Sequence, residues 1–522
     1  MRRHALFIGV FILIAAARFV ILFTSQTHVH SDEAIIGLMG KHILEGRYFP
    51  FYMYGQPYNA GAAWEAYLAA IAFAFFGVGV ISLKSCIVML SLLCLFLFYR
   101  MCLALYDERT SLLATVAFAL APSLLKWHFQ VRGYSWYFLS IPILTMLFAS
   151  IQSDRVPRKR TLFFFGLASG VSIWCLELAI PLVGALWLLL ILRRKFSLNK
   201  AATASAGLMT GYAPVIVFNF MHHFINWRYL IIERPGGGFS SLFHPSAFRR
   251  IFLDEMPKFF GPDTVLWYYP DKPTSGYVFY AIAVLAVGVA MWPFLRSPSK
   301  IIRALRGNLA DLRQEKDFDM FVLIGASFVP YLTMPDGVPS YFFGGCFFLS
   351  VLTGRMLERS FSSSTALPRI GGAGALAAIL VTGFLVMIRV GQVNQIETLS
   401  LCNDRKRYCM IRISGTDLER VEHYLRQYSV TSVWTTISFV YPLLFESGET
   451  LAVSNAIFED PFRVYPQKIP WREPSRDQYA AFVIETNAAF RPLLELRYAQ
   501  ASGSAPLVRE YGKLTIIAGP SQ

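Results

Sequence analysis

Long apolar runs separated by short polar segments make up most of the first 390 residues of this 522-residue chain. A helix needs roughly 20 apolar residues to cross a bilayer, and the pattern supplies stretches near that length repeatedly. The pattern therefore predicts an all-α polytopic membrane protein with about eleven transmembrane helices. The predicted spans are 5–24, 80–99, 111–126, 136–151, 162–176, 178–192, 203–221, 276–295, 319–334, 341–356 and 370–390.

Composition agrees with this interpretation. The chain is 55% hydrophobic and 16% charged, whereas soluble domains carry about 25% charged residues. These figures exclude a disordered chain, a disulfide scaffold and an ordinary cytosolic enzyme. The seven cysteines show neither CxxC nor metal-binding spacing. The net charge of +15 then indicates basic cytoplasmic loops, and no nucleic acid is expected as a partner.

The distribution of basic residues among the loops predicts the orientation. Lys and Arg gather in alternate loops, at 100–109, 155–160, 193–200, 296–316 and 355–369, as the positive-inside rule requires. The alternation holds only if the apolar stretch 61–77 does not cross, so we expect that stretch to lie on the outer face. Arg2 and Arg3 precede a first span that we interpret as a retained anchor, which places the N-terminus in the cytoplasm.

Two parts follow from this topology. Residues 1–390 form the transmembrane module, with a first outer loop at 25–79 and a long outer loop at 222–275. Residues 391–522 are more polar and lack a spanning run. A helical stretch and several β-rich runs there predict a small extracytoplasmic α/β domain. At its entrance, the spacing of Cys402 and Cys409 is compatible either with a disulfide or with two free thiols.

The first outer loop carries the first candidate chemistry. Ser31 can cap a helix whose first turn holds Asp32 and Glu33, because a helix N-terminus stabilises carboxylates. Capping explains one acid better than two adjacent acids at the end of a span, beside His28 and His30. A carboxylate there could act as a general base on an acceptor hydroxyl or amine. The His-x-His spacing is a weak metal signal, so a divalent metal is not indicated.

Aromatic and amide side chains follow in the same loop. Aromatic rings suit the faces of sugars and amides suit sugar hydroxyls, whereas the alternative is an interfacial aromatic belt. The residues concerned are Tyr52, Tyr54, Gln56, Tyr58, Asn59, Trp64 and Glu65.

Ionisable residues also lie at the outer ends of later spans. Lys126, His128 and Arg132 share a short outer loop that contains no acid. Such a cluster suits a phosphate ligand, and the alternative is snorkelling to lipid head groups. Lys84, near the outer end of a span, and Glu177, in an outer hairpin, are either functional or merely solvated.

Together these motifs resemble the GT-C superfamily of polyprenyl-phosphate-sugar glycosyltransferases, which includes protein O-mannosyltransferases and lipid A aminoarabinose transferases. The resemblance covers mainly residues 1–220. Its motifs are the acidic pair of SDEA (31–34), YGQPYNAGAAWEAYLAA (54–70), the FG turn (76–77), the basic start of the next span (Lys84), ALAPS (119–123) and the outer Arg132.

The resemblance implies a bacterial inner-membrane enzyme with a polyprenyl-phosphate-linked sugar as donor and an extracytoplasmic glycan, lipid or protein as acceptor. Asp32 would be the general base and Glu33 would orient the acceptor or the base, with inversion at the anomeric carbon. Arg132, with Lys84 or Lys126, would stabilise the departing phosphate, so that no cofactor is required. The sugar or acceptor pocket would comprise Tyr54, Gln56, Tyr58, Asn59, Glu65, His128 and Glu177.

Two other functions compete with this one. A lipid-linked-sugar carrier or flippase should line a path through the bundle with charge, whereas this chain concentrates charge at the outer face. A surface-polysaccharide ligase or polymerase with a pyrophosphate donor should group several Arg and a His in one large outer loop. The loop 222–275 does contain such residues, namely Arg228, Arg234, His244, Arg249 and Arg250.

Overall fold

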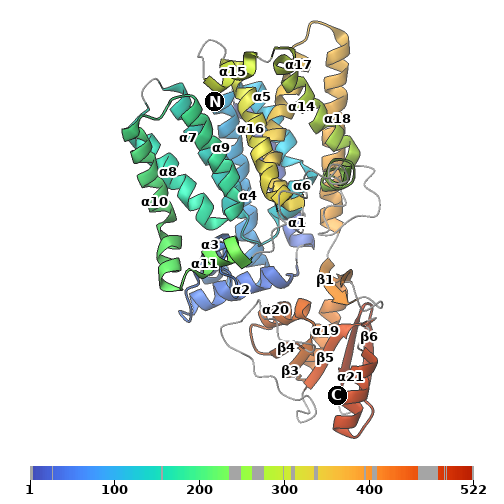
Figure 1. Ribbon diagram of the computed structural model, residues 1–522. Coiled ribbons are helices and arrows are strands. Elements are labelled where there is room, and N and C mark those ends of the chain that lie inside the picture. The colour runs from blue at the N-terminus through green and yellow to red at the C-terminus, as the bar shows by residue number, and fades with distance from the viewer. Residues whose placement is uncertain are drawn as a thin grey trace.

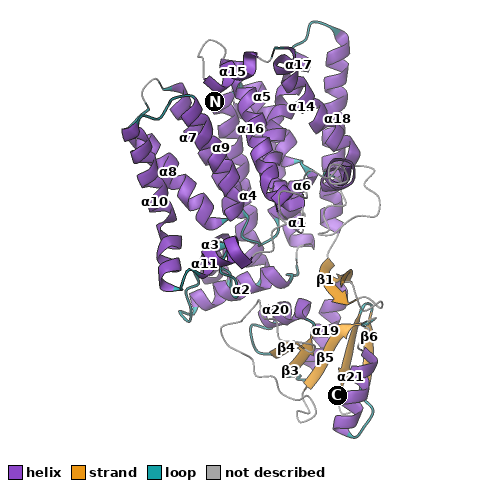
Figure 2. Ribbon diagram, viewed as in Figure 1, coloured by secondary structure: helices purple, strands orange, loops and turns teal. Residues whose placement is uncertain are grey.

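Helices form most of the described chain, and a small sheet region follows them at the C-terminal end (Figures 1 and 2). The computed structural model describes residues 4–25, 27–154, 157–233, 249–260, 276–297, 299–306, 312–333, 339–392, 395–401, 408–455, 480–486, 488 and 491–519. The N-terminus lies at the end of the helical bundle far from the sheet (Figure 1).

Every apolar run interpreted as a span coincides with one or more helices. Among the described residues, six helices, α1, α4, α7, α10, α14 and α18, are long and apolar enough to cross a membrane. The chain is therefore a multi-pass membrane protein, and the count of eleven spans stays a prediction. The helices are α1 (Ala5–Ser25), α4 (Val80–Leu105), α5 (Glu108–Ala119), α7 (Ser135–Ser153), α8 (Lys159–Cys175), α9 (Ile180–Leu192), α10 (Leu198–Met221), α14 (Gly276–Arg296), α16 (Leu312–Thr333), α17 (Phe343–Phe361) and α18 (Ala366–Gln392).

The run 111–126 is not one continuous helix. After α5 ends at Ala119, a short helix α6 (Pro122–Leu125) and a 3₁₀ turn (Lys126–His128) follow. Proline has no backbone N–H and disfavours a helical conformation in the residue before it, so the helix breaks there. The break directs the chain into the loop that carries Arg132.

The first outer loop folds into two helices at the sheet-facing end of the bundle, α2 (Ser31–Leu44) and α3 (Ala60–Phe76) (Figure 1). The 17 residues of α3 extend about 26 Å, less than the hydrocarbon thickness of about 30 Å. This length agrees with the expectation that α3 does not cross, which stays a prediction. The two helices pack closely, since a Cβ at Gly40 would lie 3.0 Å from the Cβ of Ala69.

The C-terminal sheet region, residues 395–519, confirms the expected small α/β fold. An antiparallel pair, β1 (Gln395–Leu401) and β2 (Tyr408–Ser414), precedes a five-stranded sheet of order β4-β3-β5-β7-β6. In this sheet β3 runs parallel to β4 and β5, while β7 runs antiparallel to β5 and β6. Cys402 lies outside the described residues. The elements are β3 (Ser432–Thr435), β4 (Ala452–Asn455), β5 (Ala480–Glu485), β6 (Leu507–Tyr511), β7 (Leu514–Ala518), α19 (Gly415–Gln427), α20 (Ile437–Glu446) and α21 (Arg491–Ser502).

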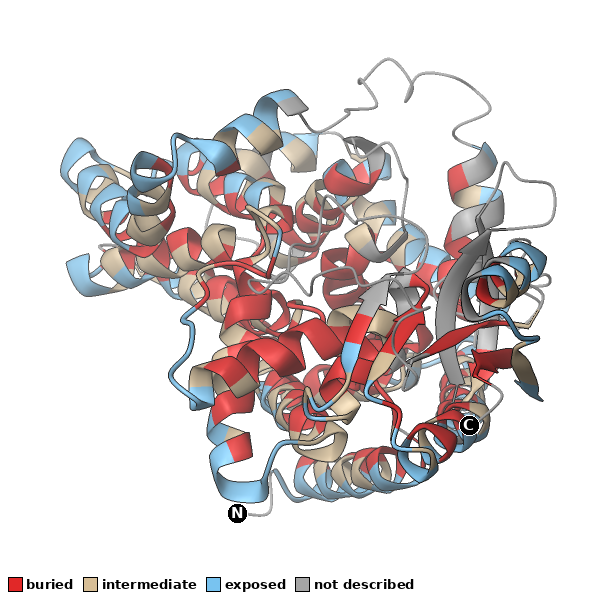
Figure 3. Cartoon of the chain, turned by 90° about the horizontal axis from the view of Figure 1, so that it is seen from below, coloured by how far each residue is buried: buried red, intermediate tan, exposed pale blue. Residues whose placement is uncertain are grey.

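One apolar core joins the sheet region to the outer helices. Ile35 and Leu38 of α2 and Ala66 of α3 belong to the same buried cluster as Val421 of α19 and Phe445 of α20. Seen from the sheet side, buried residues occur in helices and in strands alike (Figure 3). The sheet region is therefore packed onto α2 rather than tethered by a linker alone.

Close packing of α8 on α10 depends on glycine. A Cβ at Gly166 would lie 1.8 Å from the carbonyl oxygen of Ala204, and one at Gly207 would lie 2.1 Å from that of Phe163. Small residues of this kind let helix backbones approach in membranes. The contact atoms belong to backbone, so a side chain can be accommodated only if the helices separate.

Gly166→Ala should therefore destabilise the protein by about 1–3 kcal/mol, the usual cost of overpacking. The measurement is thermal unfolding of the purified protein in detergent, followed by tryptophan fluorescence. Gly184→Ala on α9 is the matched control, because its Cβ would meet nothing within 4 Å. Equal midpoints for the two variants would contradict the packing described here.

Candidate active site

Asp32 lies in the first turn of α2, whose N-terminus is capped by histidine. His30 is the N-cap: its Nδ1 accepts from the backbone N–H of Asp32 at 3.3 Å. In return, the Glu33 carboxylate accepts from the backbone N–H of His30 at 3.0 Å, which completes a capping box. The expectation that Ser31 caps this helix is wrong. The N-cap is His30, the residue before it, whose imidazole nitrogen takes the place of the serine hydroxyl as acceptor.

Glu33 connects three elements. Besides capping α2, it accepts from the backbone N–H of Val131 at 3.1 Å and lies 3.5 Å from the Nζ of Lys84 on α4. Its side chain is only 2% exposed. A carboxylate this buried needs donors and a countercharge, and these contacts supply both. Glu33 thus holds the start of α2 against the loop 129–134 and against α4.

Asp32 and Arg132 form an ion pair across the same junction. Arg132 Nη1 donates to Asp32 Oδ2 at 2.8 Å, and its Nη2 lies 3.2 Å from His30 Nδ1. Both side chains are mostly buried. The Asp32 carboxylate, which can accept a proton, is thus hydrogen-bonded to the Arg132 guanidinium, which is a strong donor to anions.

Asn59 and Glu65 fix the loop that presents Arg132. Asn59 Nδ2 donates to the carbonyl of Arg132 at 3.4 Å. The Glu65 carboxylate accepts from the backbone N–H groups of Gly133 at 2.7 Å and Ser135 at 3.0 Å. Burial raises the pKa of Glu65 to about 7, although these hydrogen bonds oppose the shift. Both residues therefore position the loop through its backbone.

Other predicted site residues lie around this group rather than in it. Tyr54 binds His42 Nδ1 at 2.9 Å, near the C-terminal end of α2. Tyr58 stacks on Tyr229, with ring centroids 5.0 Å apart. Gln56 is half-buried in the turn before α3.

The remaining candidates are Glu177, His128 and Lys126. Glu177 opens a 3₁₀ turn before α9 and lies near Tyr52. His128 is buried against Phe118, with ring centroids 6.3 Å apart. Lys126 begins the 3₁₀ turn that ends at His128, and its side chain is not among the described parts of the chain.

An aromatic cluster beside Glu65 was only partly anticipated from the sequence. Trp64 stacks on Trp136 at 5.4 Å and lies edge-on to Trp174 at 5.6 Å, which in turn contacts Phe51 at 5.4 Å. The Nε1 atoms of Trp64 and Trp174 and the hydroxyl of Tyr52 are buried without a hydrogen-bond partner among the described residues. Buried donors of this kind ordinarily have acceptors.

Arg18 is a charged residue inside the apolar run of α1. It is fully buried in α1 and donates to Ser91 Oγ of α4 at 2.8 Å. A charged residue inside an apolar run is by itself a sequence signal for a functional site.

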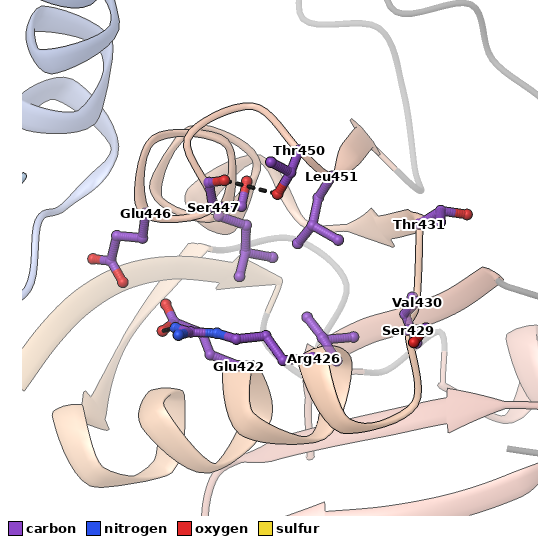
Figure 4. Close-up of a pocket in the computed structure, with 11 residues that line it drawn as sticks. Glu422, Arg426, Ser429, Val430, Thr431, Glu446, Ser447, Thr450 and Leu451 are labelled. Atoms are coloured by element: carbon purple, nitrogen blue, oxygen red, sulfur yellow. Dashed lines mark hydrogen bonds and ion pairs between the residues drawn. The ribbon is translucent and has the colours of Figure 1, made fainter. Parts of the chain in front are cut away.

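The sheet region contains a cavity of about 430 Å³ between α19 and α20, with Glu422, Arg426 and Glu446 among its lining residues (Figure 4). Burial and the neighbouring Glu446 raise the pKa of Glu422 to about 9. Glu446 also reaches out of the cavity wall, since its Oε1 accepts from the backbone N–H of Val29 at 3.4 Å. One wall of the cavity therefore contacts the loop that leads into α2.

No protein-family model and no curated protein sequence matches the chain. Its fold is similar to that of ArnT from Cupriavidus metallidurans bound to undecaprenyl phosphate, with 12% identity, a TM-score of 0.60, and 98% of this chain and 99% of that chain covered. ArnT in the apo state gives 13% identity and a TM-score of 0.54 over the same shares.

An oligosaccharyltransferase from Archaeoglobus fulgidus, tethered with an acceptor peptide, gives 11% identity and a TM-score of 0.51, over 86% of this chain and 64% of that chain. ArnT and this oligosaccharyltransferase belong to the GT-C superfamily. The expected GT-C fold is therefore confirmed.

Glu65→Gln tests the support of the Arg132 loop. An amide has one acceptor oxygen for two backbone donors, so one N–H loses its partner at a cost of about 1–3 kcal/mol. We expect a lower unfolding midpoint, measured by circular dichroism in detergent. Glu495→Gln on α21, a residue whose ion pair with Arg491 lies within one helix, is the control.

The same variant should change the pH dependence of stability. The pKa of Glu65 is raised from 4.5 to about 7, so the folded protein binds more protons than the unfolded chain between these values. This group therefore reduces stability as the pH rises from about 4.5 to about 7. Glu65→Gln should flatten that part of the profile, and an unaltered slope would argue against a buried carboxyl group here.

Proposed function

We propose that the protein is a membrane glycosyltransferase that moves a sugar from a polyprenyl-phosphate donor to an extracytoplasmic acceptor, with Asp32 as general base. The observation that carries the proposal is the contact of Asp32 with Arg132 at the start of α2, where the neighbouring Glu33 contacts Lys84. A base for the acceptor and cations for a phosphate thus share one site. The likeness to GT-C glycosyltransferases, one of them bound to undecaprenyl phosphate, supports it.

The ion pair suggests how donor and base cooperate. The donor phosphate is a diester with one negative charge, whereas the departing lipid phosphate is a monoester, which carries more charge and attracts guanidinium more strongly than one carboxylate does. As the bond from the sugar to the phosphate breaks, Arg132 would therefore shift from Asp32 to the phosphate. The carboxylate could then accept the proton of an acceptor O–H or N–H group.

Transfer follows from this arrangement. The acceptor oxygen or nitrogen attacks the anomeric carbon, the bond from that carbon to the phosphate oxygen breaks, and the configuration inverts. The acceptor proton passes to Asp32 and then to water. Arg132 and Lys84 stabilise the charge that develops on the departing lipid phosphate. Two cations suffice for a monophosphate leaving group, so the proposal needs no metal.

The aromatic cluster beside Glu65 is the best-supported place for the sugar. Trp64 and Trp174 have apolar rings of the kind that pack on sugars, and their buried N–H groups, like the hydroxyl of Tyr52, have no hydrogen-bond partner in the described part of the chain, a role that sugar oxygens would fill. Tyr58 and Glu177 lie on elements next to this cluster.

A lipid-linked-sugar carrier is the second candidate, and Arg18 is the observation that favours it. A carrier needs charged groups inside the bundle, and Arg18 is fully buried there. Two further interior charges, Asp317 and Asp319, instead form ion pairs with Arg359 and Arg193. Arg18 alone does not define a path.

Asp32→Asn distinguishes the two functions. Purified protein in lipid vesicles would receive a panel of radiolabelled polyprenyl-phosphate sugars, with extracts of cell-envelope glycans and lipids as acceptors. We expect donor consumption to fall by about 100- to 10,000-fold, the usual contribution of a general base. Glu495→Gln should consume donor as the wild type does.

Failure of the proposal has a clear signature in this assay. If the wild type binds a donor without consuming it, and Asp32→Asn binds that donor equally well, the protein is a carrier and Asp32 is not a base.

A further inference from the structure

The sheet region contacts α2, the helix that carries Asp32, at several points along its length. The end of α20 and the turn after it, residues 445–449, run alongside α2 (Figure 1). At the middle of α2, Phe445 packs over Gly37 so closely that a Cβ there would lie 2.6 Å from the phenyl ring. The ring also contacts Phe73 of α3, with centroids 6.1 Å apart. Phe445 therefore fills the space where α2 and α3 meet.

Glu449 binds the C-terminal end of α2. Its Oε1 accepts from His42 Nε2 at 3.0 Å, and its other oxygen pairs with Lys41 and lies 3.6 Å from Arg47. Lys41 Nζ also donates to the carbonyl of Gly448 at 3.0 Å. The backbone of Glu449 has a φ of +65°, which costs a non-glycine residue free energy. Contacts with three cationic or imidazole groups hold this residue in its unfavourable conformation.

Glu446 binds the segment before α2. Its Oε1 accepts from the backbone N–H of Val29, and its Oε2 lies 3.7 Å from His28 Nδ1. The other ring nitrogen of His28 lies 3.5 Å from Glu419 of α19. Val29 precedes Asp32 by three residues. The sheet region thus contacts α2 before its first turn, at its middle and at its last turn.

We propose that residues 445–449 form a clamp that positions α2, and with it Asp32, for reaction. This inference rests on the proposed function. A helix of 14 residues is marginal in water, because isolated helices below about 12–15 residues are hardly stable. Its place is set by the surfaces on either side, α3 and the clamp. Phe445, Glu446 and Glu449 are then positioning residues, and the sheet region is a working part of the transferase.

Loss of the clamp should slow the reaction rather than weaken donor binding. A displacement of a reacting group by about 1 Å costs on the order of 100-fold in rate. For Glu449→Ala we expect kcat to fall by about 10- to 100-fold with the donor KM within about two-fold of the wild type. Glu449→Gln keeps an acceptor for His42 and should recover part of the rate. Glu495→Ala, in the same region, is the matched control.

A double-mutant cycle tests the middle contact. Gly37→Ala should lower kcat, because its Cβ displaces the Phe445 ring. Phe445→Leu shortens the opposing side chain, so the double variant should be faster than Gly37→Ala alone, a coupling that independent sites do not show. A merely structural role predicts lower unfolding midpoints with kcat and KM unaltered in the folded fraction, and that result would overturn the clamp.

Hydrogen exchange separates failure of the clamp from failure of the proposed function. In full-length protein in detergent, Glu449→Ala should speed amide exchange in residues 28–44 by about ten-fold or more, with α8 and α10 unaffected. Unaltered exchange in residues 28–44 would overturn the clamp whatever the transfer assay shows. Faster exchange there, in a protein whose wild type consumes no donor, would leave the contact standing and overturn the proposed function.

Discussion

The carboxylate of Glu33 is the contact on which the rest of the site depends. It accepts from the backbone of His30 and of Val131 and lies beside Lys84, so it fixes the first turn of α2, the Arg132 loop and α4 relative to one another. Each of these elements would otherwise leave polar groups unsatisfied close to the membrane, where water is scarce. Satisfying them at one buried anion brings Asp32 and Arg132 within a hydrogen bond.

The transmembrane architecture was largely predictable, because a bilayer leaves few choices. Backbone groups in lipid must be satisfied within a segment, so apolar runs of sufficient length become helices. The run 111–126 shows the limit of that argument: Pro122 breaks the helix within an otherwise apolar stretch. In the sheet region the strands follow a local β-rich pattern. The pairing of Ser432 with Ala480, however, joins residues that are far apart in the chain.

The candidate site divides in the same way. Asp32 and Arg132 each had a local signal, an acid after a span and a cation without a nearby acid. Their contact joins positions 100 residues apart, and no local pattern encodes it. The family resemblance implies a place for Glu65 in the sugar or acceptor pocket, and in the structure its carboxylate accepts from the backbone N–H groups of Gly133 and Ser135. A side chain that serves the backbone of a distant loop cannot be recognised from its neighbours in sequence.

The two sides of the clamp are made at very different times. His42 and Glu449 lie 407 residues apart, and a ribosome adding 5–20 residues per second needs roughly 20 to 80 s to cover that distance. During this interval α2, which follows the first membrane helix in the chain, has already been synthesised. The residues of the sheet region that contact it have not. The last turn of α2 therefore lacks its contact with the sheet region until residue 449 has been synthesised.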